Sequence, residues 1–173
     1  MPKFFVSSNQ ILDNKIKIIG SDINHIQNVL RLKKNDEINI SDIDTGKNYV
    51  TKIEKFNEEA IICNIIASSD TSVETNAKIS VFQGLPKADK MEYIIQKSTE
   101  LGAYNFIPVN MKRCIVKLDN KTINKKIERW NKIAEAAAKQ SGRNIIPRVE
   151  EVKTISDICS YIDNYDIFIV AYE

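Results

Sequence analysis

The side chains in this sequence that could do chemistry are basic and amide groups. The stretch AEAAAKQSGR, residues 134–143, closes an alanine-rich run with Gln140 and Arg143. Lys87 follows the strand-like stretch KISVFQGL, and Arg113 follows the strand-like stretch NFIPV. Open α/β sheets bind ligands at the carboxyl ends of their strands, where these two cations would lie. Taken one at a time, each of these groups is more often an ordinary surface side chain.

Other kinds of chemistry find little support in the sequence. It contains no GxGxxG, P-loop, HExxH or GxSxG motif, and its three cysteines, Cys63, Cys114 and Cys159, lie far apart. The expected state of these cysteines is a reduced, buried thiol, and no metal site is expected. The single histidine, His25, has apolar neighbours, which favours a structural role over Ser-His-Asp catalysis.

Charge is distributed unevenly along the chain. Residues 1–70 hold 9 Lys/Arg and 10 Asp/Glu, residues 78–148 hold 15 and 6, and residues 149–173 hold 1 and 6. A basic middle block can attract a polyanion, although solvated helix faces would give the same composition. The amino-terminal stretch MPKFFVSSNQ has no signal-peptide core, so a cytoplasmic protein is expected.

Two rhythms of hydrophobic residues divide the sequence. Residues 1–70 alternate apolar and polar residues in short segments at 3–7, 15–20, 37–43, 48–56 and 60–67, with turn residues between them. This spacing predicts a small antiparallel β-barrel, interrupted by a short helical stretch in residues 21–31. Residues 71–77 are predicted to be a linker.

From residue 78 the pattern changes to strands alternating with helices. Strands are predicted at 78–85, 105–109, 146–152 and 165–173, and helices at 88–101, 122–141 and 155–162. Such alternation is typical of an α/β domain with a mostly parallel sheet, here assigned to residues 78–173. Leu101 is expected on the inner face of the first of these helices, and Gly102 is expected to end it.

A mostly polar stripe on the longest predicted helix leads to Gln140 and Arg143 at its carboxyl end. Arg129, Ile133, Ala136, Gln140 and Arg143 recur at helical spacing beside the apolar face. If the topology is that of an open α/β sheet, three segments bring Lys87, Arg113, Gln140 and Arg143 toward one rim.

The order of several motifs resembles one known family over the whole chain. The stretches MPKFFV, HIQNVLR, GLPKADKMEYIIQKSTELG, IPVNMKRCIVK, RWNKIAEAAAKQSGR and IPRV are similar to those of the bacterial 16S ribosomal RNA (uracil-N3) methyltransferases, also called the ribosomal small subunit methyltransferase E family. The resemblance implies an RNA-binding, PUA-like barrel followed by a SPOUT domain. In that family the SPOUT domain ends in a knot that binds S-adenosylmethionine and pairs two subunits.

The resemblance also implies roles for individual residues. Arg113 and Arg143 would handle the substrate base by stabilising negative charge on its carbonyl oxygens, and Gln140 would hydrogen-bond the base or its phosphate. Lys87 would help position phosphate. RNA-binding cations are expected at Arg31, Lys33, Lys34 and Arg129. No general base is assigned.

One departure from the family pattern changes what the chain is expected to do. The glycine-rich GPEGG segment of the family would follow Glu173, and most of the cofactor contacts would lie there. The sequence is therefore expected to be a fragment that is inactive alone, from a parent that acts on 16S ribosomal RNA as a homodimer. Two other interpretations stay open: a non-catalytic RNA-binding module, and an α/β interaction protein with solvated charges.

Overall fold

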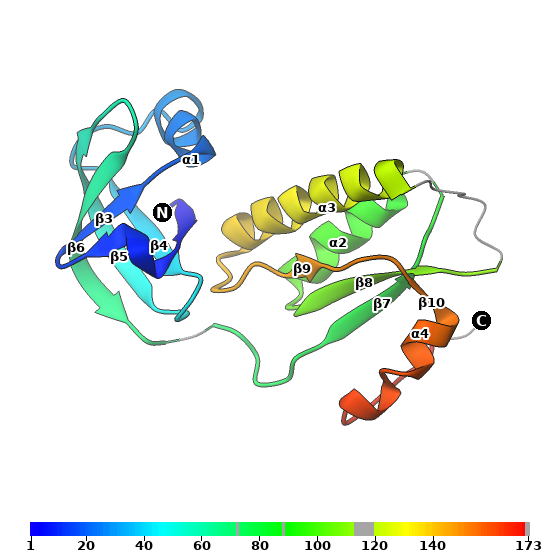
Figure 1. Ribbon diagram of the computed structural model, residues 1–173. Coiled ribbons are helices and arrows are strands. Elements are labelled where there is room, and N and C mark those ends of the chain that lie inside the picture. The colour runs from blue at the N-terminus through cyan, green and yellow to red at the C-terminus, as the bar shows by residue number, and fades with distance from the viewer. Residues whose placement is uncertain (72, 88, 113–119, 172–173) are drawn as a thin grey trace. The chain divides into compact units, whose positions relative to one another are not determined.

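Two compact units form the structure, and the first combines the amino-terminal residues with a separate, later segment of the sequence. The computed structural model describes residues 1–71, 73–87, 89–112 and 120–171 (Figure 1). The first unit contains Met1–Asn76 and Glu135–Ile146, and the second contains Ala77–Ala134 and Pro147–Glu173. The domain limits predicted from the sequence, 1–70, 71–77 and 78–173, remain predictions. They assign residues 135–146 to the second domain, whereas the structure groups these residues with the first unit.

A curled six-stranded sheet forms the first unit. Its strand order is β1-β4-β5-β6-β3-β2, and only the β1–β4 pair is parallel among the pairings described. The strands are β1 (Lys3–Val6), β2 (Ile11–Leu12), β3 (Lys15–Ile18), β4 (Glu37–Asp42), β5 (Asn48–Phe56) and β6 (Ile61–Ser69). The predicted β-rich amino-terminal domain is confirmed, with β1 as a parallel edge strand in place of an all-antiparallel arrangement.

Alternation of side chains along these strands creates the core of the first unit. Phe4, Ile16, Ile38 and Ile40 are at most 2% exposed and point to the same face of the curled sheet. Because successive strand residues point to opposite faces, the polar residues between them lie on the other face. Helix α1 (Ser21–Asn24) and the π-helical turn His25–Val29 contribute the buried side chain of Ile26.

A parallel sheet with the order β10-β8-β7 organises the second unit. Its strands are β7 (Ser80–Gly84), β8 (Asn105–Asn110), β9 (Arg148–Val149) and β10 (Lys153–Thr154), and its helices are α2 (Lys90–Glu100), α3 (Asn120–Ser141) and α4 (Ile155–Cys159). Strands β9 and β10 pair with the two ends of β8. The predicted parallel α/β arrangement is confirmed.

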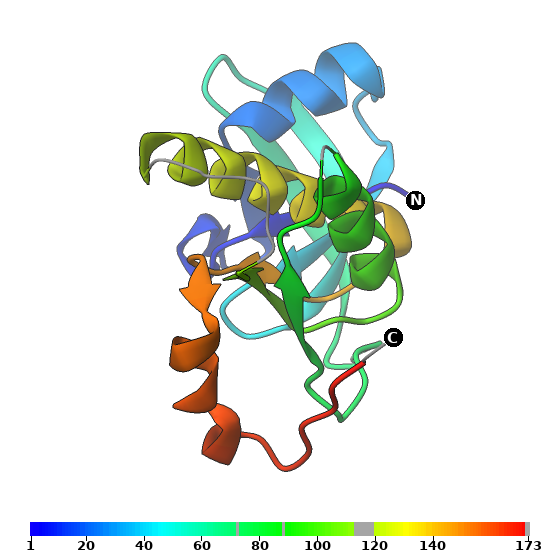
Figure 2. The same ribbon diagram turned by 90° about the vertical axis from the view of Figure 1, so that its right-hand side faces the viewer.

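Helices α2 and α3 lie on one side of this sheet, and α4 lies on the other side (Figures 1 and 2). Met91 and Ile95 of α2, Trp130 of α3 and Phe106 of β8 form the buried cluster between helices and sheet. On the other face, the Phe82 ring packs against Tyr165 and Phe168, with ring centroids 5.5 and 5.7 Å away. Apolar groups therefore cover both faces of this short parallel sheet.

Several predicted details of the second unit are wrong. Leu101 was expected on the inner face of α2 but is 85% exposed, because the helix ends at Glu100. Gly102, with a φ of +102°, turns the chain after the helix as predicted. The strand predicted at 146–152 is reduced to Arg148–Val149. Residues 165–171 form no strand, although their composition is strand-like. No helix in the described residues is long and apolar enough to span a membrane.

Candidate nucleic-acid interface

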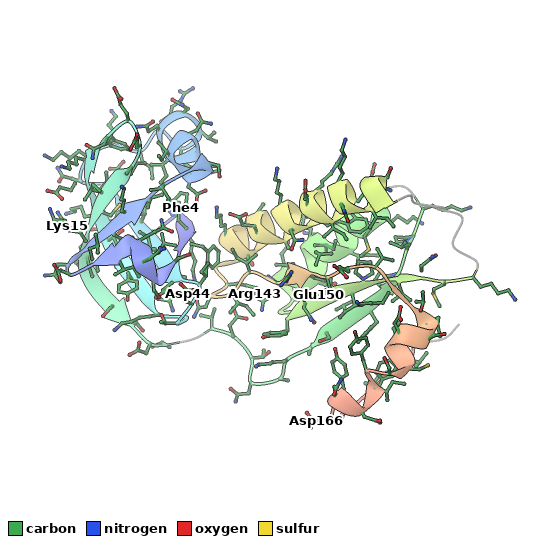
Figure 3. The ribbon with its side chains drawn as sticks, in the orientation of Figure 1. Phe4, Lys15, Asp44, Arg143, Glu150 and Asp166 are labelled. Carbon is green, nitrogen blue, oxygen red and sulfur yellow. The ribbon has the colours of Figure 1, made fainter. Side chains whose placement is uncertain are left out.

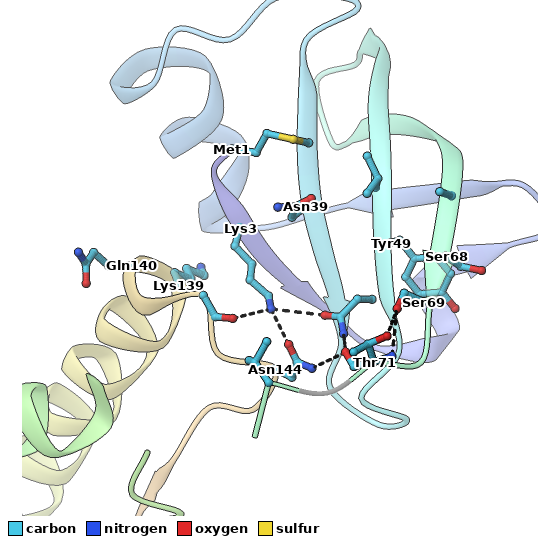
Figure 4. Close-up of a pocket in the computed structure, with 15 residues that line it drawn as sticks. Met1, Lys3, Asn39, Tyr49, Ser68, Ser69, Thr71, Lys139, Gln140 and Asn144 are labelled. Atoms are coloured by element: carbon cyan, nitrogen blue, oxygen red, sulfur yellow. Dashed lines mark hydrogen bonds between the residues drawn. The ribbon is translucent and has the colours of Figure 1, made fainter. Parts of the chain in front are cut away.

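The carboxyl end of α3 is held against the curled sheet by Lys3. The Lys3 Nζ donates hydrogen bonds to the Gly142 carbonyl oxygen at 3.0 Å and to Asn144 Oδ1 at 2.8 Å (Figure 4). It also reaches Asn48 Oδ1 at 3.4 Å. Burial lowers the pKa of Lys3, and the nearby Glu74 carboxylate opposes this effect. A cation at this place satisfies a carbonyl group that helix geometry leaves without a partner at the end of α3.

Arg143, predicted to handle substrate, is buried in an ion pair. Its guanidinium group bonds the Glu74 carboxylate, and the two side chains are only 6% and 17% exposed. Glu74 Oε1 also accepts hydrogen bonds from the backbone N–H groups of Asn144 at 2.7 Å and Ile145 at 3.3 Å. Figure 3 shows Arg143 just beyond α3, where Gly142 has a φ of +73°. The arrangement fixes the polypeptide that leaves the helix.

Two opposing effects act on the Glu74 carboxyl group. Burial raises its pKa, but hydrogen bonds from Arg143 and from the backbone of Asn144 and Ile145 outweigh burial, so the pKa lies below its usual value. The carboxylate is therefore charged at neutral pH and compensates the guanidinium group.

A second ion pair holds the same helix end. Lys139 Nζ lies 2.8 Å from Asp22 Oδ1 on α1 and 2.7 Å from Glu135 Oε1 on α3. It also lies 5.7 Å from the centre of the Phe4 ring, within the range of a cation–π contact. Burial lowers the pKa of Lys139, but the two carboxylates outweigh it, and the pKa is raised.

A pocket of about 380 Å³ opens beside these contacts, within the first unit. Its lining contains side chains from four strands, the end of α3 and the segment after β6: Met1, Lys3, Asn39, Asn48, Tyr49, Val50, Ala67, Ser68, Ser69, Thr71, Val73, Lys139, Gln140, Gly142 and Asn144. No Asp or Glu is among them. The lining combines apolar side chains such as Met1, Val50 and Val73 with amide, hydroxyl and ammonium groups, and Gln140 lies at its rim (Figure 4).

The predicted site residues are divided between the two units. Gln140 and Arg143 belong to the first unit and Lys87 to the second, so the expected cluster forms within neither unit. Lys87 is exposed after β7, and Arg113 lies outside the described residues. The shared rim of these four side chains therefore remains a prediction.

The remaining predicted cations are exposed, three in the first unit and one in the second. Arg31, Lys33 and Lys34 are exposed in the turn that leads to β4, where Arg31 has a φ of +53°. Arg129 forms an ion pair with Glu92 on α2 at 2.8 Å, and its side chain remains 66% exposed.

Four residues of this polar site were not predicted from the sequence: Lys3, Asn39, Asn48 and Asn144. One signal was present: Lys3 and Asn39 alternate with the core residues Phe4 and Ile40, so they point away from the core. That alternation identifies a polar face, but it does not identify α3 as its neighbour. Among the described residues, no group of three or more His, Cys, Asp or Glu could hold a metal ion.

Comparisons with known proteins define the class to which this architecture belongs. Residues 18–66 match the model of the RNA methyltransferase PUA domain, and residues 73–173 match the model of the RNA methyltransferase domain. The chain therefore combines a PUA-type domain with an RNA methyltransferase domain. It belongs to the RNA methyltransferase family, in the branch whose curated relatives are called ribosomal RNA small subunit methyltransferase E.

Individual relatives support this placement. The Bacillus subtilis ribosomal RNA small subunit methyltransferase E is 40% identical over 156 residues, which cover 90% of this chain and 60% of that protein. The Aquifex aeolicus protein of the same name is 30% identical, over 84% of this chain and 61% of its own length. The chain thus spans about 60% of the length of these relatives.

A solved relative adds a ligand. The crystal structure of the Neisseria gonorrhoeae ribosomal RNA small subunit methyltransferase E, bound to S-adenosyl methionine, aligns with a TM-score of 0.77 and 31% identity. The alignment covers 88% of this chain and 62% of that one.

Some described residues at the carboxyl edge of the parallel sheet contact one another. The Gln83 side-chain amide donates to the adjacent Gly84 carbonyl oxygen at 2.9 Å. The Met111 side chain lies so close to Gly84 that a Cβ there would be 2.7 Å from the sulfur. Lys87 and Asp89 are exposed. No described residue at this edge is assigned as a contact of S-adenosyl methionine.

Proposed function

We propose that this chain is the RNA-binding part of an enzyme that methylates N3 of a uridine in 16S ribosomal RNA, with S-adenosylmethionine as methyl donor. The observation that carries the proposal is the pair of domain matches, PUA followed by RNA methyltransferase, together with relatives named for the small-subunit ribosomal RNA. The parent protein would work in the cytoplasm as a homodimer. The present chain alone would be inactive.

The chemistry makes a specific demand on the protein. The N3 nitrogen of uridine carries a proton at neutral pH and must lose it to become a nucleophile, which spreads negative charge onto the neighbouring carbonyl oxygens. Arg113 remains our candidate for stabilising that charge as an oriented cationic donor. Lys87 remains a candidate for positioning phosphate.

Arg143 has a different part in this proposal. Its guanidinium group is compensated by Glu74, and its side chain is only 6% exposed, which favours a positioning role over contact with the base. By fixing the end of α3, it would hold Gln140 at the rim of the pocket in the first unit. No described residue is assigned as the general base.

The first unit, with its curled sheet, would contribute most of the RNA binding. Arg31, Lys33 and Lys34 are exposed cations in one turn, and Arg129 offers a further cation on the second unit. If about six phosphates are contacted, binding should weaken by roughly a thousandfold between about 50 and 200 mM salt.

Two measurements test the proposal. The full-length gene product should transfer methyl groups to small ribosomal subunits that lack the modification, and Arg113→Ala should reduce this transfer strongly. For the present chain, Lys33→Ala with Lys34→Ala should weaken binding of a 16S ribosomal RNA fragment and flatten its salt dependence. Lys17→Ala, on the exposed side of β3, is the control for loss of charge elsewhere. Absence of transfer by the full-length protein would contradict the enzymatic proposal.

A non-catalytic RNA-binding module is the second candidate. It is favoured by the exposed cations Arg31, Lys33 and Lys34 of the PUA-type unit. Calorimetry separates the two candidates for this chain. Tight binding of S-adenosylmethionine would argue against a purely RNA-binding chain, whereas RNA binding without it would support that alternative.

A further inference from the structure

The pocket of the first unit lies on the face of the curled sheet that is turned away from its core. In the strand register Lys3 is opposite Asn39, Asn39 is opposite Val50, and Val50 is opposite Ala67. These residues therefore form one row across β1, β4, β5 and β6 on the same face. The neighbouring row belongs to the core on the other face, where Phe4 is opposite the fully buried Ile40.

The floor of this pocket is short and apolar. Val50 and Ala67 are adjacent across β5 and β6, and both line the pocket. Two small side chains next to each other on a pleated sheet leave a shallow, flat surface. Such a surface can receive the face of a planar ring, because neither the Val50 nor the Ala67 side chain projects far from its strand.

Amide and hydroxyl groups surround the floor, and some of them are held in place. Asn144 Oδ1 accepts from Lys3, and Asn48 Nδ2 donates to the Thr71 carbonyl oxygen at 3.1 Å. The Asn39 and Gln140 side chains have no hydrogen-bond partner within the described part of the chain, so their amide groups can serve a ligand. An amide group both donates and accepts, as the edge of a nucleobase requires.

The charge of the lining favours an anionic ligand over a cationic one. Lys3 and Lys139 line the pocket, and no carboxylate lines it, although Asp22 and Glu135 pair with Lys139 from outside the lining. Because Asp22 and Glu135 compensate Lys139, a phosphodiester next to the pocket would be attracted mainly by Lys3, whose hydrogen-bond partners are neutral groups. The volume of about 380 Å³ lies within the range of small-ligand sites.

We propose that this pocket receives the base of one unpaired nucleotide of the RNA, placed against Val50 and Ala67, with Asn39 and Gln140 at its edge. The inference rests on the proposed RNA function and extends it, since it adds a docking point for a nucleotide within the PUA-type unit. Proteins recognise unpaired bases through their flat faces and their hydrogen-bonding edges, and both features are combined in this pocket. A base inside a duplex cannot enter such a pocket without leaving its partner.

A matched pair of substitutions on β6 tests the pocket. Ala67→Phe fills the floor, and Asn64→Phe places the same side chain on an exposed position of the same strand outside the pocket. Binding to a short single-stranded RNA and to an RNA duplex of equal length is measured by fluorescence anisotropy with the full chain. We expect Ala67→Phe to weaken single-strand binding about tenfold, and Asn64→Phe to change it less than about twofold. Duplex binding should respond equally little to both variants.

A second variant and a local probe guard against misfolding. Gln140→Ala, at an exposed position, should weaken single-strand binding about threefold to fivefold without disturbing the sheet. In the unsubstituted chain, single-stranded RNA should shift the methyl resonances of Val50 and Ala67, while the buried methyl groups of Ile16 and Ile38 report an intact core.

The outcomes separate this inference from the proposed function. One outcome would contradict the pocket proposal but not the RNA function. In that outcome, Ala67→Phe, Gln140→Ala and the unsubstituted chain bind RNA equally and with the same salt dependence, and RNA does not shift the Val50 and Ala67 methyl resonances. Absence of any RNA binding would overturn both. Shifts produced equally by an RNA duplex would also overturn the pocket, because the base would then not need to be unpaired.

Discussion

The ion pair between Glu74 and Arg143 predicts a large loss of stability when one partner is removed. The Arg143 side chain is 6% exposed and that of Glu74 is 17% exposed, so neither charge is well hydrated. Glu74→Ala removes the carboxylate that compensates the guanidinium group, together with the acceptor for the Asn144 and Ile145 N–H groups. Breaking a buried pair in this way typically costs about 3–5 kcal/mol. We expect about 3 kcal/mol, at the lower end, since Glu74 keeps some contact with solvent.

A milder substitution separates charge from hydrogen bonding. Glu74→Gln retains an oxygen acceptor for the Asn144 N–H group but leaves Arg143 without its counter-charge, which should cost about 1–2 kcal/mol. Glu92→Gln serves as the control, because its partner Arg129 is 66% exposed. Exposed pairs of this kind contribute at most about 1 kcal/mol.

Native-state hydrogen exchange is the appropriate assay, because it reports the free energy of opening separately for each unit. The amides of Ile38 and Ile40 report the first unit, and the amide of Phe106 reports the second. A double-mutant cycle of Glu74→Gln and Arg143→Met should give a coupling of at least about 1 kcal/mol. A coupling below about 0.3 kcal/mol would refute the argument that these two charges compensate each other.

The same pair gives stability a defined dependence on pH. The pKa of Glu74 in the folded chain lies below its usual value, although burial opposes this shift. Its stabilising contribution is therefore present above the unfolded-state pKa of about 4.3 and is lost as the pH falls through the folded-state pKa. Glu74→Gln should remove this part of the acid sensitivity of the first unit.

Further predictions concern other parts of the two units. Cys159 was predicted to be buried and is exposed, whereas Cys63 is fully buried and burial raises its pKa to about 11. In a Cys114→Ser background, a thiol reagent at neutral pH should therefore label Cys159 and spare Cys63 until denaturant is added, as counted by mass spectrometry. Asp42→Ala removes the acceptor for Ser8 Oγ at 2.6 Å and Thr45 Oγ1 at 2.8 Å, and should lower the unfolding free energy of the first unit by about 1–3 kcal/mol in hydrogen exchange. Phe106→Ala, in the core of the second unit, should cost about 3–5 kcal/mol in the same assay, and a cost below about 1 kcal/mol would contradict its place in that core.

Local patterns in the sequence predicted most of the strands and helices. Alternation in NYVTKIEKF identified β5, Asn48–Phe56, with the same limits as the structure. Helical spacing identified the buried Met91 and Ile95 on α2. These features depend on a period of two or of 3.6 residues, which is a local property of the chain.

Features that depend on distant contacts could not be predicted in this way. Lys3 and Asn144 are 141 positions apart, and Lys139 and Asp22 are 117 positions apart. No period or spacing in the sequence relates such residues, so the grouping of residues 135–146 with the first unit could not be predicted. The strand expected at residues 165–173 is not formed by residues 165–171 for a related reason. A β-branched composition indicates that a segment can pair, and pairing still requires a neighbouring strand.

The polar tail of AEAAAKQSGR shows how burial changes the interpretation of a motif. Gln140 and Arg143 are three positions apart and were expected to face one substrate, yet Gln140 is exposed at the pocket and Arg143 is buried against Glu74. The difference arises at Gly142, whose positive φ ends the helical path and turns the next side chain inward. Helical spacing therefore applies to Gln140 and no longer applies to Arg143. The Arg143 guanidinium group already has a counter-charge, so a phosphate would add little binding energy there. The Gln140 amide group has no such partner among the described residues, so a hydrogen bond to RNA would add binding energy. We therefore expect substitutions of Gln140 to change RNA specificity and substitutions of Arg143 to change stability.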